Sequence, residues 1–237
     1  MGFLRAPSFP STRSWRSLLV SIHVIASVCW LGLAVALVAL LGLSLSSPPG
    51  GTRTAAAAMA HELDVTVLGF SAMIAALSGF ALSTATAWGW FQHRWVSAKV
   101  VLTLGQIALG TAVLGRALPG VAEDAGRGAH GVALPVAVGL GLVATGLAVQ
   151  VWLSVAKPGG RTRWGRRASG RLPTAPTWVF AMMVGLPLVD TGLHASGVVD
   201  LPVLSAVGLV AVLVARARTA PGVARPSRSA RGARVGG

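Results

Sequence analysis

Long apolar segments separated by short polar stretches constrain this chain more than any other feature of its sequence. An α-helix needs about 20 mostly apolar residues to cross the hydrocarbon of a bilayer. Inside lipid every backbone polar group must find a partner within the protein, which favours helices. The segments that approach this length are 18–43, 63–86, 97–118, 130–153, 177–194 and 199–215. We therefore predict an all-α protein, a polytopic transmembrane helical bundle of about six spans.

Composition supports this class. Of 237 residues, 54% are hydrophobic and 11% are charged, whereas soluble domains carry about 25% charged residues. The apolar run near the N-terminus follows several Arg, as in a signal peptide. It is far longer than the roughly 7–15 apolar residues of a signal sequence, however. We expect it to be retained as the first span.

A basic stretch between the fourth and fifth segments sets the orientation. Residues 156–171, AKPGGRTRWGRRASGR, carry one Lys and five Arg and no acid. Such loops stay in the cytoplasm. With six spans, 17 of the 20 Lys and Arg fall on the same side, and only Arg53, Arg116 and Arg127 fall on the other. We predict that both termini are cytoplasmic and that the protein resides in the cell membrane.

The chain then divides into five parts. They are a basic cytoplasmic N-terminus (1–16), a four-helix transmembrane core (17–155), a basic cytoplasmic loop (156–174), a C-terminal pair of transmembrane helices (175–216) and a disordered Arg-rich tail (217–237). The net charge of +14 sits mostly beside apolar segments and in the tail. We expect the loop and tail to contact anionic lipid headgroups rather than nucleic acid.

Small residues recur every fourth position in two spans. Close helix packing in a membrane uses such stripes, because no hydrophobic effect drives helices together in lipid. We expect both stripes to face the interior of the bundle. They are Ser71, Ala75, Gly79 and Ser83 in the second span and Ala137, Gly141 and Thr145 in the fourth.

His23 is a polar residue inside the first apolar segment, and polar residues at such positions are functional candidates. As a ligand of haem or of a metal ion it would need a second histidine at similar depth. The nearest by topology is His93, in the loop between the second and third spans. The other interpretation is a hydrogen bond from His23 to a neighbouring helix.

A second set of candidates lies at the predicted outer ends of the helices. His61 and Asp64 stand near the start of the second span, His130 opens the fourth, and Asp190 and His194 close the fifth. Imidazole and carboxylate groups that converge on one face suit Zn(II) or Cu(II). The alternative is that these residues are solvated or cap helix ends.

Three stretches resemble a known family. They are HVIASVCWLG (23–32), WGWFQHRWVSAKVVLTL (88–104) and LSVAKPGGRTRWGRR (153–167). They are similar to a family of multi-pass membrane proteins of actinobacteria with high-GC genomes, over about residues 15 to 180. The resemblance implies a four-helix core, a basic loop and further hydrophobic sequence. It also implies a distant similarity to copper-resistance-D-like membrane proteins, but no established activity.

No motif of nucleophilic or metal-dependent hydrolysis is present, such as GxSxG or HExxH. We therefore expect an integral membrane protein without enzymatic activity. One alternative is a haem-binding or copper-related redox protein that uses His23 or the outer set. The other is a small transporter or an accessory subunit, with the fifth span broken at Pro187, Gln106 at mid-depth, and a homo-oligomer completing the pathway.

Overall fold

The computed structural model describes residues 11–86, 89–129, 131–167, 175–196 and 203–219, and these residues are helical apart from the connecting turns. The all-α prediction is confirmed for them. In chain order the helices are α1 (Thr12–Ser46), α2 (Gly51–Leu63), η1 (Asp64–Leu68), α3 (Gly69–Ala85), α4 (Arg94–Leu109), η2 (Gly110–Leu114), α5 (Gly115–Gly126), α6 (Ala133–Ala156), α7 (Arg163–Arg167), α8 (Thr177–Ala195) and α9 (Val203–Thr219).

Short π-helical turns join some of these elements into longer helices. Through η1 and η2 the chain runs without interruption over Gly51–Ala85 and Arg94–Gly126. Together with α1 and α6, these make four helices that are long and apolar enough to cross a membrane. They contain the first four predicted spans. The fifth and sixth predicted segments form the shorter helices α8 and α9.

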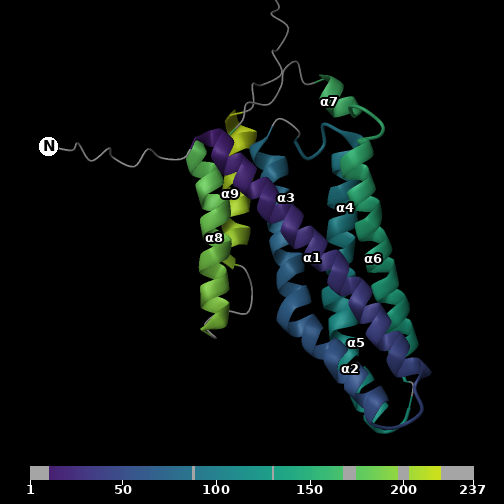
Figure 1. Ribbon diagram of the computed structural model, residues 1–237. Coiled ribbons are helices and arrows are strands. Elements are labelled where there is room, and N and C mark those ends of the chain that lie inside the picture. The colour runs from purple at the N-terminus through teal and green to yellow at the C-terminus, as the bar shows by residue number, and fades with distance from the viewer. Residues whose placement is uncertain (1–10, 87–88, 130, 168–174, 197–202, 220–237) are drawn as a thin grey trace, which may run out of the picture.

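Three of the four helices are longer than a bilayer is thick. Each has 33 to 35 residues, or about 50 Å at 1.5 Å per residue, whereas the hydrocarbon is about 30 Å thick. In the two helices that include a π-helical turn, the extra length lies in α2 and α5, whereas α1 is long as a single α-helix. In Figure 1, α8 and α9 lie beside the half of the bundle that holds the start of α1, and they leave the α2 and α5 end uncovered.

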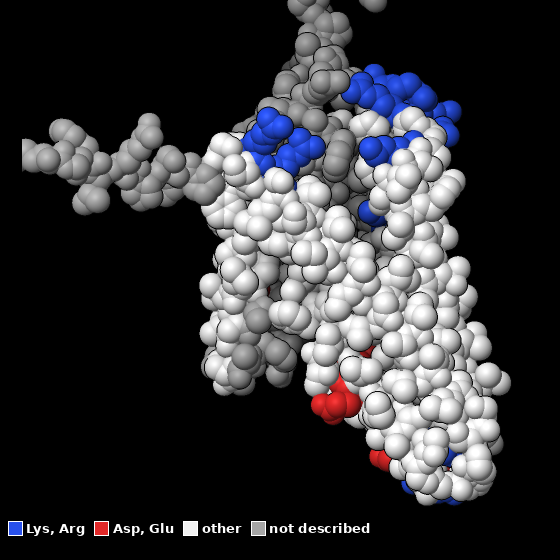
Figure 2. All heavy atoms as spheres, viewed as in Figure 1, with Lys and Arg blue, Asp and Glu red and all other residues white. Residues whose placement is uncertain are grey.

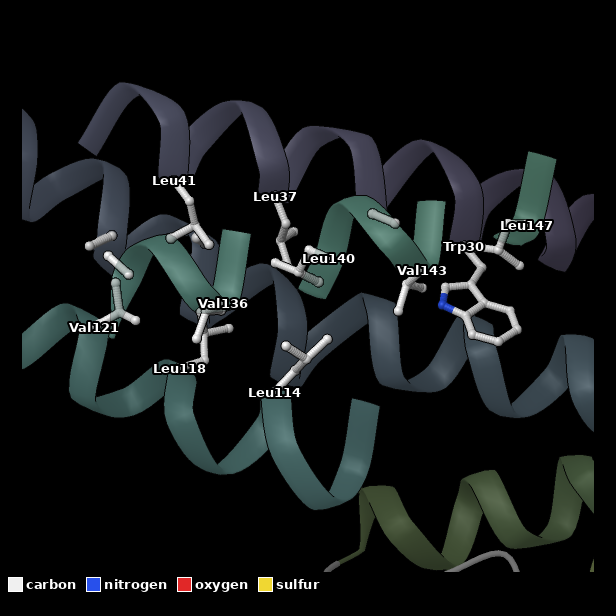
Figure 3. Packing of buried hydrophobic residues seen from close by; sticks show 14 of the residues in the cluster. Trp30, Leu37, Leu41, Leu114, Leu118, Val121, Val136, Leu140, Val143 and Leu147 are labelled. Carbon is white, nitrogen blue, oxygen red and sulfur yellow. The ribbon is translucent and has the colours of Figure 1, made fainter. Parts of the chain in front are cut away.

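Helix α1 crosses the bundle diagonally and packs against α2, α3 and α6. Its apolar face meets η2, α5 and α6 in one cluster of buried side chains, shown in Figure 3. Trp30 of α1 is only 4% exposed there. Leu37 of α1 faces Leu140 of α6, and Leu41 lies further along the same stripe.

A second apolar cluster attaches the C-terminal pair. Phe180 of α8 and Val212 of α9 are buried against Leu19 of α1 and Ala81 and Ala85 of α3. The close fit uses small residues on α3, where a larger side chain would keep α8 away. The C-terminal helices therefore pack on the outside of the α1–α3 pair.

Only one of the two predicted small-residue stripes faces inward. Ser71 and Ala75 of the second span are buried. The prediction for α6 is wrong, because Thr145 is exposed and a Cβ at Gly141 would meet no atom within 4 Å. The buried face of α6 instead carries larger residues at helical spacing, which fill the space against α1. They are Val136, Leu140, Val143, Leu147 and Gln150.

Charge is segregated along the bundle. In Figure 2 most basic side chains gather at the end that holds α7 and the start of α1, and the visible acidic ones lie toward the opposite end. At that opposite end Arg127 donates to Asp124 at 2.9 Å, and this hydrogen bond raises the pKa of the guanidinium. The described residues thus show the asymmetry of charge on which the orientation was predicted.

Candidate functional site

His23 of α1 turns toward α3. Its Nδ1 atom lies 2.9 Å from the carbonyl oxygen of Ala75 and 3.1 Å from Oγ of Ser78. Since a carbonyl only accepts hydrogen bonds, Nδ1 carries the proton and Nε2 keeps its lone pair. His23 therefore forms the hydrogen bond to a neighbouring helix that was one of its two interpretations, and its hydrogen bonds among the described residues both involve Nδ1.

The position of the imidazole depends on Gly79. A Cβ built at Gly79 would lie 2.9 Å from Cε1 of His23, closer than real Cβ atoms approach. Any larger residue at position 79 would displace the imidazole ring of His23. The predicted stripe of the second span thus accommodates His23 rather than only a helix backbone.

His23 lines a pocket of about 250 Å³ between α1, α3, α4 and α6. This volume lies just below the roughly 300–1,000 Å³ of most drug-sized ligand sites. Much of the wall is apolar and aromatic, with Val20, Val24, Phe80 and Trp95. Its polar lining comes mainly from α4 and α6 and comprises His23, Ser83, Lys99, Thr103, Gln150, Ser154 and Lys157.

Lys99 is the charged group inside α4. Its Nζ donates to Oγ of Ser154 on α6 at 2.9 Å. No carboxylate of the described residues lies within ion-pair distance of it, since the ion pairs there both belong to Arg127. An ammonium carries three donors, so Lys99 has N–H groups left to offer to the pocket.

Below Lys99 a chain of hydrogen bonds continues into the bundle. Thr103 donates to Oε1 of Gln150 at 3.0 Å, and Nε2 of Gln150 donates to Oε1 of Gln106 at 2.5 Å. Gln106 in turn donates to the carbonyl of Val143 at 3.0 Å. These side chains satisfy one another and join α4 to α6.

Gly146 allows this approach. A Cβ at Gly146 would lie 2.5 Å from Nε2 of Gln106. Beyond Gln106, the neighbouring helices contribute Leu114, Leu140 and Val143 to the apolar cluster of Figure 3. The polar region therefore ends inside the bundle, and apolar side chains close it on the far side.

The rim of the pocket is a docked loop. Lys157 ends α6 in the left-handed conformation, with φ of 47°, and lines the pocket. The loop after it pairs with the α3–α4 loop, since Arg94 N donates to Gly160 O at 3.2 Å and Thr162 N donates to Gln92 O at 2.9 Å. The basic loop is thus held against the bundle.

Haem does not fit the lining of this pocket. A bis-histidine haem needs two imidazoles, and the pocket offers only His23 beside the ammonium of Lys99. His93 lies in the α3–α4 loop, where it forms a backbone bridge with Arg161. The two histidines considered as haem ligands are therefore not brought into one pocket.

The outer histidines and carboxylates are only partly described. His130 and the side chain of His194 lie outside the described residues. His61 lies in the last turn of α2 and Asp64 opens η1, about one turn apart on the same continuous helix. Within the described part of the chain, no three His, Cys, Asp or Glu side chains are close enough to hold a metal ion. The five-residue metal site stays a prediction.

Asp190 has a different role in the structure. It is 4% exposed, and its Oδ2 atom accepts from Ser205 N at 2.7 Å and from Ser205 Oγ at 2.5 Å. Its Oδ1 atom accepts from Leu204 N at 3.1 Å. A carboxylate on α8 therefore caps the first turn of α9, whose N–H groups have no partner within the helix. The predicted break at Pro187 is wrong, because α8 continues through it.

Sequence reasoning missed Lys99, Thr103 and Gln150 as parts of a site. Lys99 was counted only as a topological charge. The spacing of Lys99, Thr103 and Gln106 places them on one face of a helix, and so does the spacing of Gln150 and Ser154. That periodicity was the available signal.

Comparison with known proteins adds no relative. No protein family, no curated protein and no solved structure matches this chain.

Proposed function

We propose that this chain is an integral protein of the cell membrane that crosses the bilayer six times, with both termini in the cytoplasm. The segregation of Lys and Arg supports this orientation. Helix α8 has 19 residues, about 28 Å at 1.5 Å per residue, which suits a short span. Membership in the multi-pass family that the sequence resembles is part of the same proposal.

We further propose that the protein is a binding protein without enzymatic activity, whose four-helix core takes up a small anion in the pocket beside His23. The observation that supports this proposal is the position of Lys99. Its ammonium lines a pocket between apolar helices without a described carboxylate partner.

The energetics favour an anion over a cation. A Lys at the centre of a spanning helix costs about 2.5–3.5 kcal/mol on insertion scales, and less near the helix end. Charged residues in spans therefore pair with one another or mark a ligand or ion pathway. Lys157 on the rim adds a second positive charge, so a metal cation would be repelled and a phosphate or carboxylate attracted.

Thermal unfolding of the full chain in a neutral detergent tests the proposal. Inorganic phosphate and acetate, added at constant ionic strength, should raise the unfolding temperature of the parent protein. Lys99→Gln should remove the increase while keeping a donor toward Ser154. Arg116→Gln, an exposed change further along the same continuous helix, serves as the matched control. An equal increase in the Lys99 variant would contradict the proposal.

The alternatives drawn from the sequence have their own readouts. A Soret band in the purified protein would support haem binding. Metal analysis of the parent and of the variant with His61, His130 and His194 replaced by Ala tests the outer site. Transport and a homo-oligomer stay predictions.

A further inference from the structure

We infer that the anion is the phosphate of an anionic membrane lipid, which enters the pocket from the bilayer beside α1. This inference rests on the proposed function, because it requires that the pocket binds an anion through Lys99. It commits to the lipid as the source of the phosphate. Four observations carry it, namely depth, lateral opening, apolar walls and the count of available donors.

The depth of the pocket matches the region below a lipid headgroup. Lys157 follows the last residue of α6, and Lys99 bonds Ser154 only two residues before that end. The lining on α6 reaches inward to Gln150, seven residues or about 10 Å from Lys157. The two ammonium groups therefore lie where the apolar part of a span ends, which is the headgroup level.

The pocket is open on the side of α1. Val24 lines it and is also 52% exposed. On the same helix Ile25 and Val28 are 70% and 62% exposed, so this surface of α1 is apolar and faces the surroundings. A ligand from the bilayer would reach the pocket past Val24 without crossing a polar barrier.

The walls suit an acyl chain better than a hydrated ion. Val20, Val24, Phe80, Val96 and Val100 line the pocket from three helices. An ion in contact with these apolar side chains alone would lose its hydration without compensation. The first methylene groups of a lipid chain gain from the same contact.

Few hydrogen-bond donors remain for an ion deep in the pocket. Thr103, Gln150 and Gln106 already bond one another and the carbonyl of Val143. Among the lining residues, the positively charged donors with unused capacity are Lys99 and, at the rim, Lys157. A phosphate diester with one negative charge can contact these while its other oxygens stay near interfacial water.

Lipid binding to the full chain can be measured by native mass spectrometry in neutral detergent, with phosphatidylglycerol and phosphatidylcholine as probes. The parent protein should retain one phosphatidylglycerol and show no comparable retention of phosphatidylcholine. Lys99→Gln should weaken retention of phosphatidylglycerol about tenfold, as expected for loss of a charge-assisted hydrogen bond. Arg166→Gln, an exposed change in α7, just after the docked loop and outside the lining, should leave it unchanged.

A second pair of variants tests the entrance without touching a charge. Val24→Trp should obstruct the pocket and lower retention to a similar degree. Ile25→Trp, on the neighbouring exposed position that does not line the pocket, is its control. Both sites are exposed, so neither change threatens folding.

The outcomes separate the two proposals. The lipid site is supported if retention of phosphatidylglycerol falls in the Lys99 and Val24 variants and in neither control variant. Inorganic phosphate could still stabilise the protein through Lys99 while lipid retention is unchanged in the Lys99 and Val24 variants. The lipid inference is then wrong, and the proposed anion pocket is retained. If neither probe depends on Lys99, both proposals fall. Equal losses in the Arg166 variant would indicate a general basic surface and would also overturn the inference.

Discussion

Replacing Asp190 by alanine tests the contact that joins α8 to α9. The carboxylate accepts hydrogen bonds from Leu204 N, Ser205 N and Ser205 Oγ at 2.5 to 3.1 Å. Alanine removes all three and leaves two backbone N–H groups at the start of α9 without a partner. We expect α9 to detach more often from the bundle while the four long helices stay assembled.

The size of the effect follows from known ranges. Loss of an N-cap costs about 0.5–2 kcal/mol, and hydrogen bonds between spanning helices average about 0.6 kcal/mol each. With three bonds to one buried carboxylate, we expect a loss of about 2 kcal/mol, or about a 30-fold higher opening constant. Asp190→Asn keeps an acceptor oxygen and should cost about half as much.

Cysteine accessibility measures this opening. Val212 is 2% exposed in the middle of α9, and Cys29 is the only native cysteine. In a Cys29→Ala background, the maleimide labelling rate of Val212→Cys in mild detergent reports how often α9 opens. Adding Asp190→Ala should raise the rate about 30-fold. Asp124→Ala, at the other end of the bundle, is the control.

A labelling rate within about threefold of the parent would refute the reasoning, because 30-fold corresponds to the whole expected energy. Such a result would mean that apolar packing of α8 and α9 on α1 and α3 determines the attachment.

Three further predictions concern packing and orientation. Gly146→Val places a side chain where Gln106 now lies and should destabilise the protein by about 1–3 kcal/mol in thermal or denaturant unfolding. The control is Gly141→Val, where the space is open, and it should cost much less. Arg53→Met removes buried donors to the carbonyls of Ser44, in the last turn of α1, and Gly128, in the α5–α6 turn, at 3.2 and 3.0 Å. Limited proteolysis should therefore cleave the α5–α6 turn faster, and an unchanged rate would contradict this. A membrane-impermeant maleimide on intact cells should label a cysteine placed at 129 and spare one placed at Arg163, and the reverse pattern would invert the proposed topology.

The sequence predicted the four long apolar helices well because lipid imposes a simple rule on length and polarity. It did not predict that the helices continue beyond the predicted segments, through 51–62 in α2 and 119–126 in α5. Those parts are rich in Ala and Gly and carry charge, so hydropathy identifies no span there. Packing holds them, with Ala57 and Ala60 fully buried and Arg53 bonding Ser44 O and Gly128 O.

The candidate site divides in the same way. His23 is visible from sequence alone, since a histidine in an apolar segment is rare. Lys99 and Gln150 become parts of one site only when α4 meets α6, and which helix faces meet depends on tertiary packing. The role of Asp190 likewise depends on a partner, Ser205, on another helix. A sequence pattern predicts that such a residue lies on a helix, but it does not predict which residue of another helix it contacts.

The length of the bundle has a practical consequence. If the long helices cross a bilayer as we propose, helices of about 50 Å in a hydrocarbon of about 30 Å would leave folded protein in water, at the end where α2 and α5 meet. A detergent micelle would leave that projection bare, so antibody fragments raised against the turn at Pro48 and Pro49 would bind a rigid epitope. For a 24.0 kDa chain, otherwise mostly hidden in the micelle, such a complex would supply the mass and shape that particle alignment in electron microscopy requires.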